Sequence, residues 1–168
     1  MRKILSLLIC VPIIAFAQNT FVPDDNFENY LEANGMGDGI ALNNNVFTAN
    51  INTVTILTID WLNISDLTGI EDFIALTELR CHDNQITSLD LSNNPALTFL
   101  DCGRNQLTSL DVSNNFALSI LWAGENQLTS LNVSQNSLLY YLNCSVNQLS
   151  SLNVCCNPMI EILYCNQN

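Results

Sequence analysis

The chain has 168 residues, enough for one domain, and its 16 acidic residues against 4 basic ones give a net charge of −12 at neutral pH. Nucleic acids and anionic lipids are bound through Lys and Arg, so this balance excludes both as partners. A cationic partner fits the charge, as does the simpler role of keeping an exported protein soluble.

Residues 1–17 have the features of a secretory signal peptide. Arg2 and Lys3 form a positive start, an apolar run extends from Ile4 to Ile14, and Ala15-Phe16-Ala17 is a small-residue cleavage site. The run is too short to span a membrane. We therefore predict a protein that is secreted or held at the cell surface, with no membrane insertion after cleavage.

Cleavage before Gln18 leaves two arginines against 16 acids, a net charge of −14. Lipidation at Cys10 is the alternative, and it is disfavoured because Ile9 stands where that signal requires a smaller residue.

Residues 18–53 are predicted to form an N-terminal cap that contains one short helix, roughly residues 25–34. Asp25 and Glu28 have capping-box spacing, and Gly35 is a natural stop. One helical face is apolar, with Phe27, Tyr30 and Leu31. The glycine-rich stretch after the helix is interpreted as a flexible turn, because a calcium loop requires more oxygen ligands at set spacing.

Residues 46–60 alternate and are rich in β-branched side chains, which is typical of extended structure. From residue 54 the chain becomes repetitive. The first rung, 54–75, is one residue longer than the others, has Leu62 where later rungs have Asn, and is expected to form a helical turn within 65–73. The other rungs are 76–96, 97–117, 118–138, 139–159 and a partial one at 160–168.

Each regular rung is 21 residues long and contains one motif twice. In the first of them the motif is Leu76-x-x-Leu79-x-Cys81-x-x-Asn84 and then Ile86-x-x-Leu89-x-Leu91-x-x-Asn94. Both halves alternate, so we expect each rung to be a flattened coil with a strand on either face, stacked in parallel at about 4.8 Å. The inward side chains drive folding only when neighbouring rungs cover one another.

These motifs resemble the leucine-rich repeat superfamily, and most closely the 21-residue nested class of exported bacterial proteins. The resemblance covers residues 54–168. It implies a β-rich, right-handed solenoid of about five rungs with parallel strands and a binding role, usually through the concave face. Members often continue into further rungs. The partial last rung leaves an open strand edge, which favours further rungs or end-to-end self-association.

Two columns of asparagine mark the places where the coil turns. Buried amides there can bond the backbone groups that the turns leave unpaired. The columns are Asn84, Asn105, Asn126, Asn147 and Asn168, and Asn94, Asn115, Asn136 and Asn157.

The cysteines are interpreted mainly as small apolar groups. Four of them share one inward column with Ala123, namely Cys81, Cys102, Cys144 and Cys165. Parallel Cβ atoms at a rung's spacing are wider apart than disulfides prefer, so we expect free thiols. Cys155 stands where other rungs have Ser, which favours a tolerated substitution. A strained bridge to the adjacent Cys156, or a bridge to another chain, is the alternative.

Neither catalysis nor a metal centre is expected. Cys81 and His82 are neighbours on a strand, so they face opposite ways and cannot act as nucleophile and base. Zinc requires four convergent ligands. Asp90 and Asp111 stack on the back face, where a polar exterior is favoured over a bound cation. We predict no catalytic residue and no cofactor.

The outward positions of the concave strands change from charged to aromatic along the array. Such an exposed apolar patch usually marks a contact surface, although broad side chains also simply cover a sheet. The predicted contact residues are Phe99, Ile120, Trp122, Tyr141, Ile162 and Tyr164. They indicate a non-catalytic binding module for a protein or a glycan, and the alternative is a passive stalk in a larger surface protein.

Overall fold

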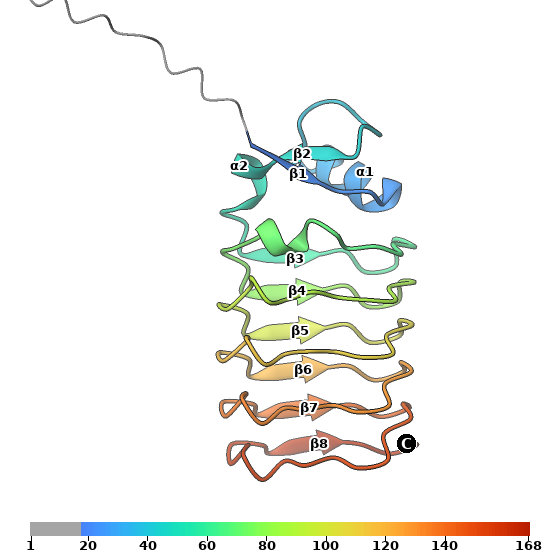
Figure 1. The fold of residues 1–168 in the computed structure, drawn as a ribbon, viewed down its shortest axis with the longest axis vertical. Helices are drawn as coiled ribbons and strands as arrows, with labels where there is room; N and C mark the ends of the chain where they lie inside the picture. The colour runs from blue at the N-terminus through green and yellow to red at the C-terminus, as the bar shows by residue number, and fades with distance from the viewer. Residues whose placement is uncertain (1–17) are drawn as a thin grey trace, which may run out of the picture.

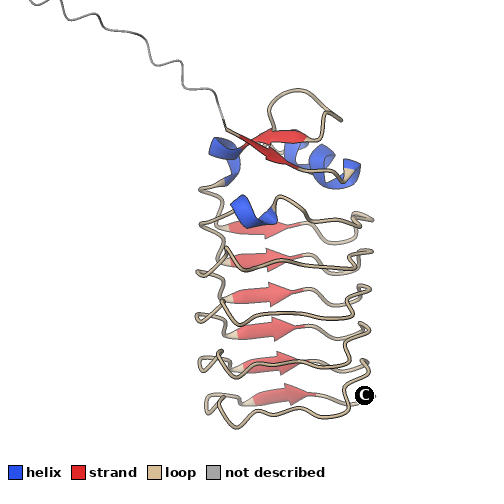
Figure 2. Ribbon diagram, viewed as in Figure 1, coloured by secondary structure: helices blue, strands red, loops and turns tan. Residues whose placement is uncertain are grey.

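The computed structural model describes residues 18–168. Within them the chain forms a stack of coils closed at one end by a small cap (Figures 1 and 2). Six parallel strands, one per rung, make a single sheet in the order in which they occur along the chain. They are β3 (Ile56–Thr58), β4 (Glu78–Arg80), β5 (Phe99–Asp101), β6 (Ile120–Trp122), β7 (Tyr141–Asn143) and β8 (Ile162–Tyr164). The predicted solenoid of about five rungs and a partial one is confirmed.

The register of the sheet follows the 21-residue period. Leu79 pairs with Leu100, Leu100 with Leu121, and Leu121 with Leu142. All four leucines are fully buried, so the same inward position lines the core in every rung. The 22-residue first rung is accommodated without a slip, since Leu57 pairs with Leu79.

The back face differs from the prediction of a second row of strands. Among residues 18–168 its only regular pairing is the isolated parallel bridge between Asp111 and Asn132. Two tight turns follow one another in each of these half-rungs, as at residues 92–96, and leave too few consecutive extended residues for a strand. In the first rung the predicted helical turn is a short 3₁₀ helix, Ile70–Asp72.

The buried asparagines bond to the backbone as predicted, but the two columns differ. The Asn105 amide donates to three carbonyls, of Cys81, Cys102 and Gly103, and its Oδ1 accepts from the Ile86 N–H. The Asn115 amide donates to two carbonyls, those of Leu91 and Asn94, and its Oδ1 has no hydrogen-bond partner among residues 18–168. The first column therefore ties each turn to its neighbours more completely.

Helix α1 (Asp25–Ala33) lies where the sequence predicts it, but its capping residue is different. Asp24, not Asp25, caps the helix, accepting from the N–H groups of Asn26 and Phe27 at 3.0 Å. Glu28 is fully buried and accepts from the backbone of the 43–44 loop instead of completing a capping box. Gly35, with φ of +73°, ends the helix as expected.

In the rest of the cap only extended structure from residue 46 was predicted, and a helical turn interrupts it. Strand β1 (Asn19–Phe21) pairs antiparallel with β2 (Asn45–Phe47), and a single helical turn, α2 (Thr48–Ile51), leads into the first rung. Val22, Phe27 and Ile51 are fully buried, so the cap closes the apolar end of the stack. No helix in residues 18–168 has the length and apolar character to cross a membrane. The predicted signal segment, residues 1–17, lies outside the described residues.

Candidate functional site

The outward side chains of the sheet form two straight columns. One contains Glu78, Phe99, Ile120, Tyr141 and Ile162, and the other contains Arg80, Asp101, Trp122, Asn143 and Tyr164. Parallel strands in exact register place equivalent positions side by side. All six predicted contact residues therefore lie on one face, as the period predicts, while their role in binding stays a prediction.

Aromatic side chains contact one another diagonally between these columns. The ring centroids of Phe99 and Trp122 are 5.5 Å apart, those of Trp122 and Tyr141 are 5.7 Å apart, and those of Tyr141 and Tyr164 are 5.8 Å apart. The Arg80 guanidinium lies 4.6 Å from the Phe99 ring centre. We call these five residues the aromatic ladder. Tilted rings at such distances attract one another, so the ladder is preorganised.

The ladder is less exposed than a free patch would be. Phe99, Trp122 and Tyr141 are half-buried because each ring covers its neighbours, and only Tyr164 is 50 % exposed. Burial raises the pKa of Tyr141, and the neighbouring Tyr164 adds to the effect. The rings therefore cover the sheet and still present one edge outward, and their role as a contact surface stays a prediction.

A second ladder, which the sequence analysis missed, runs along the carboxyl ends of the strands. The Trp61 indole N–H donates to Asp83 at 2.9 Å, and Arg104 donates to both Asp83 and Glu125, at 3.3 and 2.9 Å. These contacts lower the pKa of Asp83 despite the opposing effect of desolvation, and the Glu125 and Asp83 carboxylates raise the pKa of Arg104. Trp61, Asp83, Arg104 and Glu125 occupy the same position of successive rungs, and this shared position could have predicted their contacts from the sequence.

Between the two ladders lies a small notch with Gly103 and Gly124 on its lining. Its volume is about 80 Å³. The other lining groups include Asp101 and Trp122 from the sheet and His82 from the preceding rung. The His82 Nδ1 lies 3.7 Å from the Asp101 Oδ1, so His82 faces outward while Cys81 is fully buried, as predicted.

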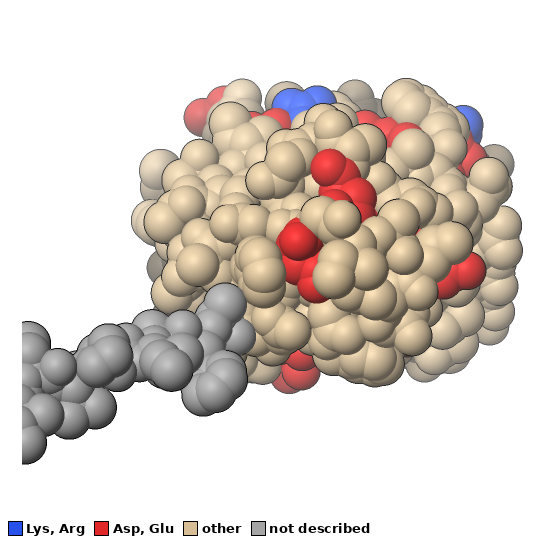
Figure 3. Space-filling model, turned by 90° about the horizontal axis from the view of Figure 1, so that it is seen from above, with Lys and Arg blue, Asp and Glu red and all other residues tan. Residues whose placement is uncertain are grey.

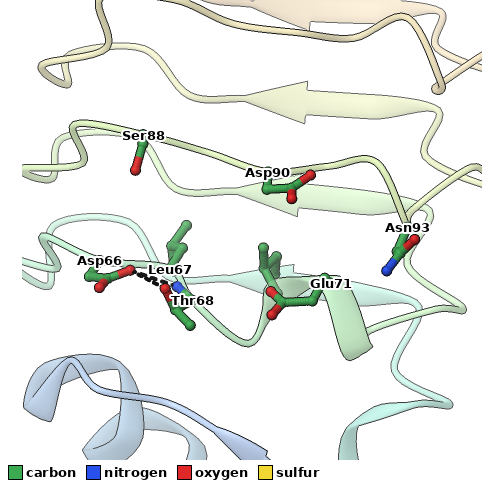
Figure 4. A pocket seen from close by; sticks show the side chains of 8 residues that line it. Asp66, Leu67, Thr68, Glu71, Ser88, Asp90 and Asn93 are labelled. Atoms are coloured by element: carbon green, nitrogen blue, oxygen red, sulfur yellow. Dashed lines mark hydrogen bonds between the residues drawn. The ribbon is translucent and has the colours of Figure 1, made fainter.

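A larger hollow of about 200 Å³ lies on the back face beside the 3₁₀ helix (Figure 4). Its acidic groups are occupied locally: Asp66 accepts from Thr68, Glu71 from the Gly69 N–H, and Asp90 from the Ser92 N–H. Within residues 18–168 no cluster of His, Cys, Asp or Glu is arranged to hold a metal ion. The hollow is therefore a surface feature between the first rung and the second.

All six cysteines within residues 18–168 are free, and for the four of the inward column this is the predicted state. Cys81, Cys102 and Cys144 are fully buried, and burial raises the pKa of each thiol, that of Cys144 to about 11. Cys155, Cys156 and Cys165 are exposed. The buried thiols thus behave as small core groups.

A sheet of stacked single strands, with an apolar lining and asparagines at the turns, defines the class of leucine-rich repeat proteins. The model for leucine-rich repeats (2 copies) matches residues 74–117. Internalin J of Listeria monocytogenes is 40 % identical over 76 residues, which are 45 % of this chain and 8 % of that protein.

Solved structures extend the likeness to most of the chain. The functional domain of InlJ from Listeria monocytogenes, described as including a cysteine ladder, is 39 % identical with a TM-score of 0.80, covering 89 % of this chain and 33 % of that one. Internalin InlF of the same species is 25 % identical with a TM-score of 0.74, covering 85 % and 43 %. The chain therefore has the fold of leucine-rich repeat proteins and is similar to the bacterial internalins. It spans less than half of each of these relatives.

Proposed function

We propose that the chain is a non-catalytic, exported binding module that recognises a protein partner through the concave face of its sheet. The observation that carries this proposal is the continuous aromatic ladder, from Arg80 through Trp122 to Tyr164, on a rigid parallel sheet. Tyr, Trp and Arg are the residues that most often dominate the energetics of protein interfaces.

The geometry favours a protein over a free glycan. The concave hollow beside the ladder has a volume of about 80 Å³, whereas pockets that enclose small ligands are usually about 300 Å³ or larger. A broad, half-buried aromatic stripe with a polar border has the composition of a protein interface, whose core is apolar and whose rim is wet. Leucine-rich repeat proteins in general bind proteins, which supports the same choice. The predicted signal segment supports export.

The proposal is tested by capture of partners from bacterial and host surface extracts with the immobilised protein. Replacing Trp122 and Tyr164 with Ala should reduce the captured amount of any specific partner at least about tenfold, because the two rings are the centre and the exposed end of the ladder. The matched control is Phe116→Ala, which removes a 56 % exposed ring away from the sheet and should leave capture unchanged.

Unchanged folding of all variants, checked by circular dichroism, is required for the comparison. Equal capture by the wild-type protein and the doubly substituted variant would contradict the proposal.

A further inference from the structure

The notch between the two ladders exists because glycine occupies the same position in two consecutive rungs. A Cβ on Gly103 would lie 3.2 Å from the His82 Nδ1 and 3.3 Å from the Asp101 Oδ1. A Cβ on Gly124 would lie 3.1 Å from the Asn143 Oδ1. Side chains at either position would therefore fill the hollow.

The backbone itself does not require these glycines. Neither has a positive φ, in contrast to Gly35, Gly39 and Gly69. The equivalent position is His82 in the preceding rung and Ser145 in the following one, so the repeat accepts side chains there. The pair of glycines thus keeps space open on the concave face.

Asp101 brings an almost buried negative charge to this space. Only 7 % of the residue is exposed, and its side chain accepts one hydrogen bond, from the Gly103 N–H at 3.1 Å. The closest basic group is His82, at 3.7 Å. Burial raises the pKa of Asp101, and the charge of Asp60 adds to this effect. The Gly103 N–H, His82 and Arg80 offset it in part. A carboxylate removed from water in this way is costly unless a cation accompanies it.

The arginines that the structure describes form ion pairs with carboxylates other than Asp101. Among residues 18–168 there are two arginines, and Arg80 pairs with Glu78 at 2.5 Å. Arg104 lines the notch, but its guanidinium pairs with Asp83 and with Glu125, which also lines the notch. The acidic excess is visible from the capped end, where red groups are scattered over the face and blue ones are confined to its rim (Figure 3). Arg80, the neighbour of Asp101 in the sheet register, lowers the pKa of Asp101 without forming an ion pair with it. A permanent positive charge in direct contact with Asp101 has therefore to come from another molecule.

We propose that the notch at Gly103 and Gly124 receives the cationic end of a Lys or Arg side chain of a protein partner, whose flanking apolar side chains lie along the aromatic ladder. This inference rests on the proposed function and names the chemistry of the partner. The hollow has the size of a side-chain end, and the net charge of −12 favours a basic segment. Trp122 lines the notch and adds a cation–π contact, as Phe99 does for Arg80 one rung away.

The test uses two peptides that differ only in the charged group, acetyl-Phe-Lys-Phe-amide and acetyl-Phe-norleucine-Phe-amide, titrated into the ¹⁵N-labelled protein. The reporters are the amides of Gly103 and Gly124 and the indole N–H of Trp122, which has no acceptor among residues 18–168. The protein has two Trp residues, so a Trp61→Phe variant assigns that indole signal. We expect saturable shifts at these reporters with the lysine peptide and at least about fivefold weaker binding of the norleucine peptide.

Two isosteric variants separate the notch from general electrostatics. Asp101→Asn copies Asn143, which occupies the same position and accepts from the N–H two residues on, as Asp101 does. It should weaken the lysine peptide about tenfold. Asp111→Asn makes the same charge change on the back face, where Asp111 accepts from the Ser113 N–H in the same way, and should change nothing. Gly103→Ser, which fills the hollow, should also weaken the lysine peptide.

Equal affinity for the two peptides, or an effect of Asp101→Asn no larger than that of Asp111→Asn, would overturn the inference. Equivalent shifts with N-acetylglucosamine would also overturn it in favour of a hydroxyl-rich ligand. The proposed function fails separately: capture that survives loss of Trp122 and Tyr164 refutes the binding face, whereas lost capture combined with no lysine preference refutes only the notch.

Discussion

At the scale of single residues, the most unusual feature is a column of left-handed backbone without glycine. It occupies the eighth position of successive rungs, where Asp83, Arg104, Glu125, Val146 and Gln167 have φ between +50° and +59°. From Asp83 to Val146 the conformation is held because the N–H at this position donates to the next rung, as Val146 does to Asn166 at 2.9 Å. Side chains with a Cβ pay about 1–2 kcal/mol for this conformation, and β-branched ones are genuine outliers.

Val146 is the β-branched member of this column, so replacing it should stabilise the protein. We expect Val146→Asn to raise the free energy of unfolding by about 1 kcal/mol, or the melting temperature by about 2–4 °C, because Asn tolerates the left-handed region. The control is Val146→Thr, which is polar and has the same branching. Thermal unfolding that shows equal stabilisation by Thr would mean that polarity at this 40 % exposed site, and not backbone strain, is responsible.

At the scale of elements, Asp24 joins the cap to the array. One carboxylate oxygen caps α1, and the other accepts from the Ser65 N–H and hydroxyl at 2.8 and 2.9 Å and from the Asp66 N–H at 3.2 Å. Desolvation acts to raise the pKa of Asp24, but the hydrogen bonds from Ser65, Phe27 and Asp66 outweigh it and lower the pKa below 3.8. The ionised form is thus the one that stabilises the fold.

We predict that Asp24→Asn lowers the free energy of unfolding by about 1–2 kcal/mol at pH 7, because the amide has one oxygen and cannot replace both acceptor oxygens of the carboxylate. Since the folded pKa is depressed, the stabilisation by wild-type Asp24 is present above the unfolded pKa near 3.8 and is lost as the pH falls through the lower folded value. The gap between the two proteins should therefore narrow below about pH 4 in urea titrations.

The neighbouring Asp25 provides the control, since it is exposed and its replacement by Asn makes the same change of charge. Asp25→Asn should cost little at any pH. A gap for Asp24→Asn that does not change with pH would contradict the assigned charge state.

Apart from α1, the elements that the sequence predicts correctly are the strands that the repeat aligns on one face. The register of β4 to β8 follows from the period, because a shift by one residue would expose every inward leucine, and the columns of the aromatic ladder follow from the register. The pairing of β1 with β2 could not be predicted in this way, since 23 residues of non-repeating chain separate Phe21 from Asn45. The notch was missed because it depends on the neighbours of Gly103 and Gly124, which become adjacent only in the stack.

At the scale of the whole molecule, the array is a one-dimensional stack in which each rung contacts only its neighbours. The end with the cap is well covered, as Leu57 and Leu79 are almost fully buried. At the other end Leu163 is 39 % exposed, although its partner Leu142 is fully buried. In a protein made of these residues, local opening should therefore be easiest at β8 and hardest near the cap.

The inward thiols allow this order to be measured. In urea below the main transition, iodoacetamide should modify Cys144 before Cys102 and Cys81, while Cys155, Cys156 and Cys165 react already in the native protein. The expected order follows from the distance of each thiol to the exposed end of the stack. Burial raises the pKa of Cys144 to about 11, so this thiol forms the reactive thiolate only after its rung has opened.

An Ala123→Cys variant supplies the matching control. Ala123 is fully buried in the same inward column, where the repeat already accepts Cys, so the new thiol should react after Cys144 and before Cys102. Mass spectrometry of the modified peptides gives the order directly. If all four thiols instead become reactive together at the main transition, the stack unfolds as one cooperative unit, and the aromatic ladder and the notch are held by every rung at once.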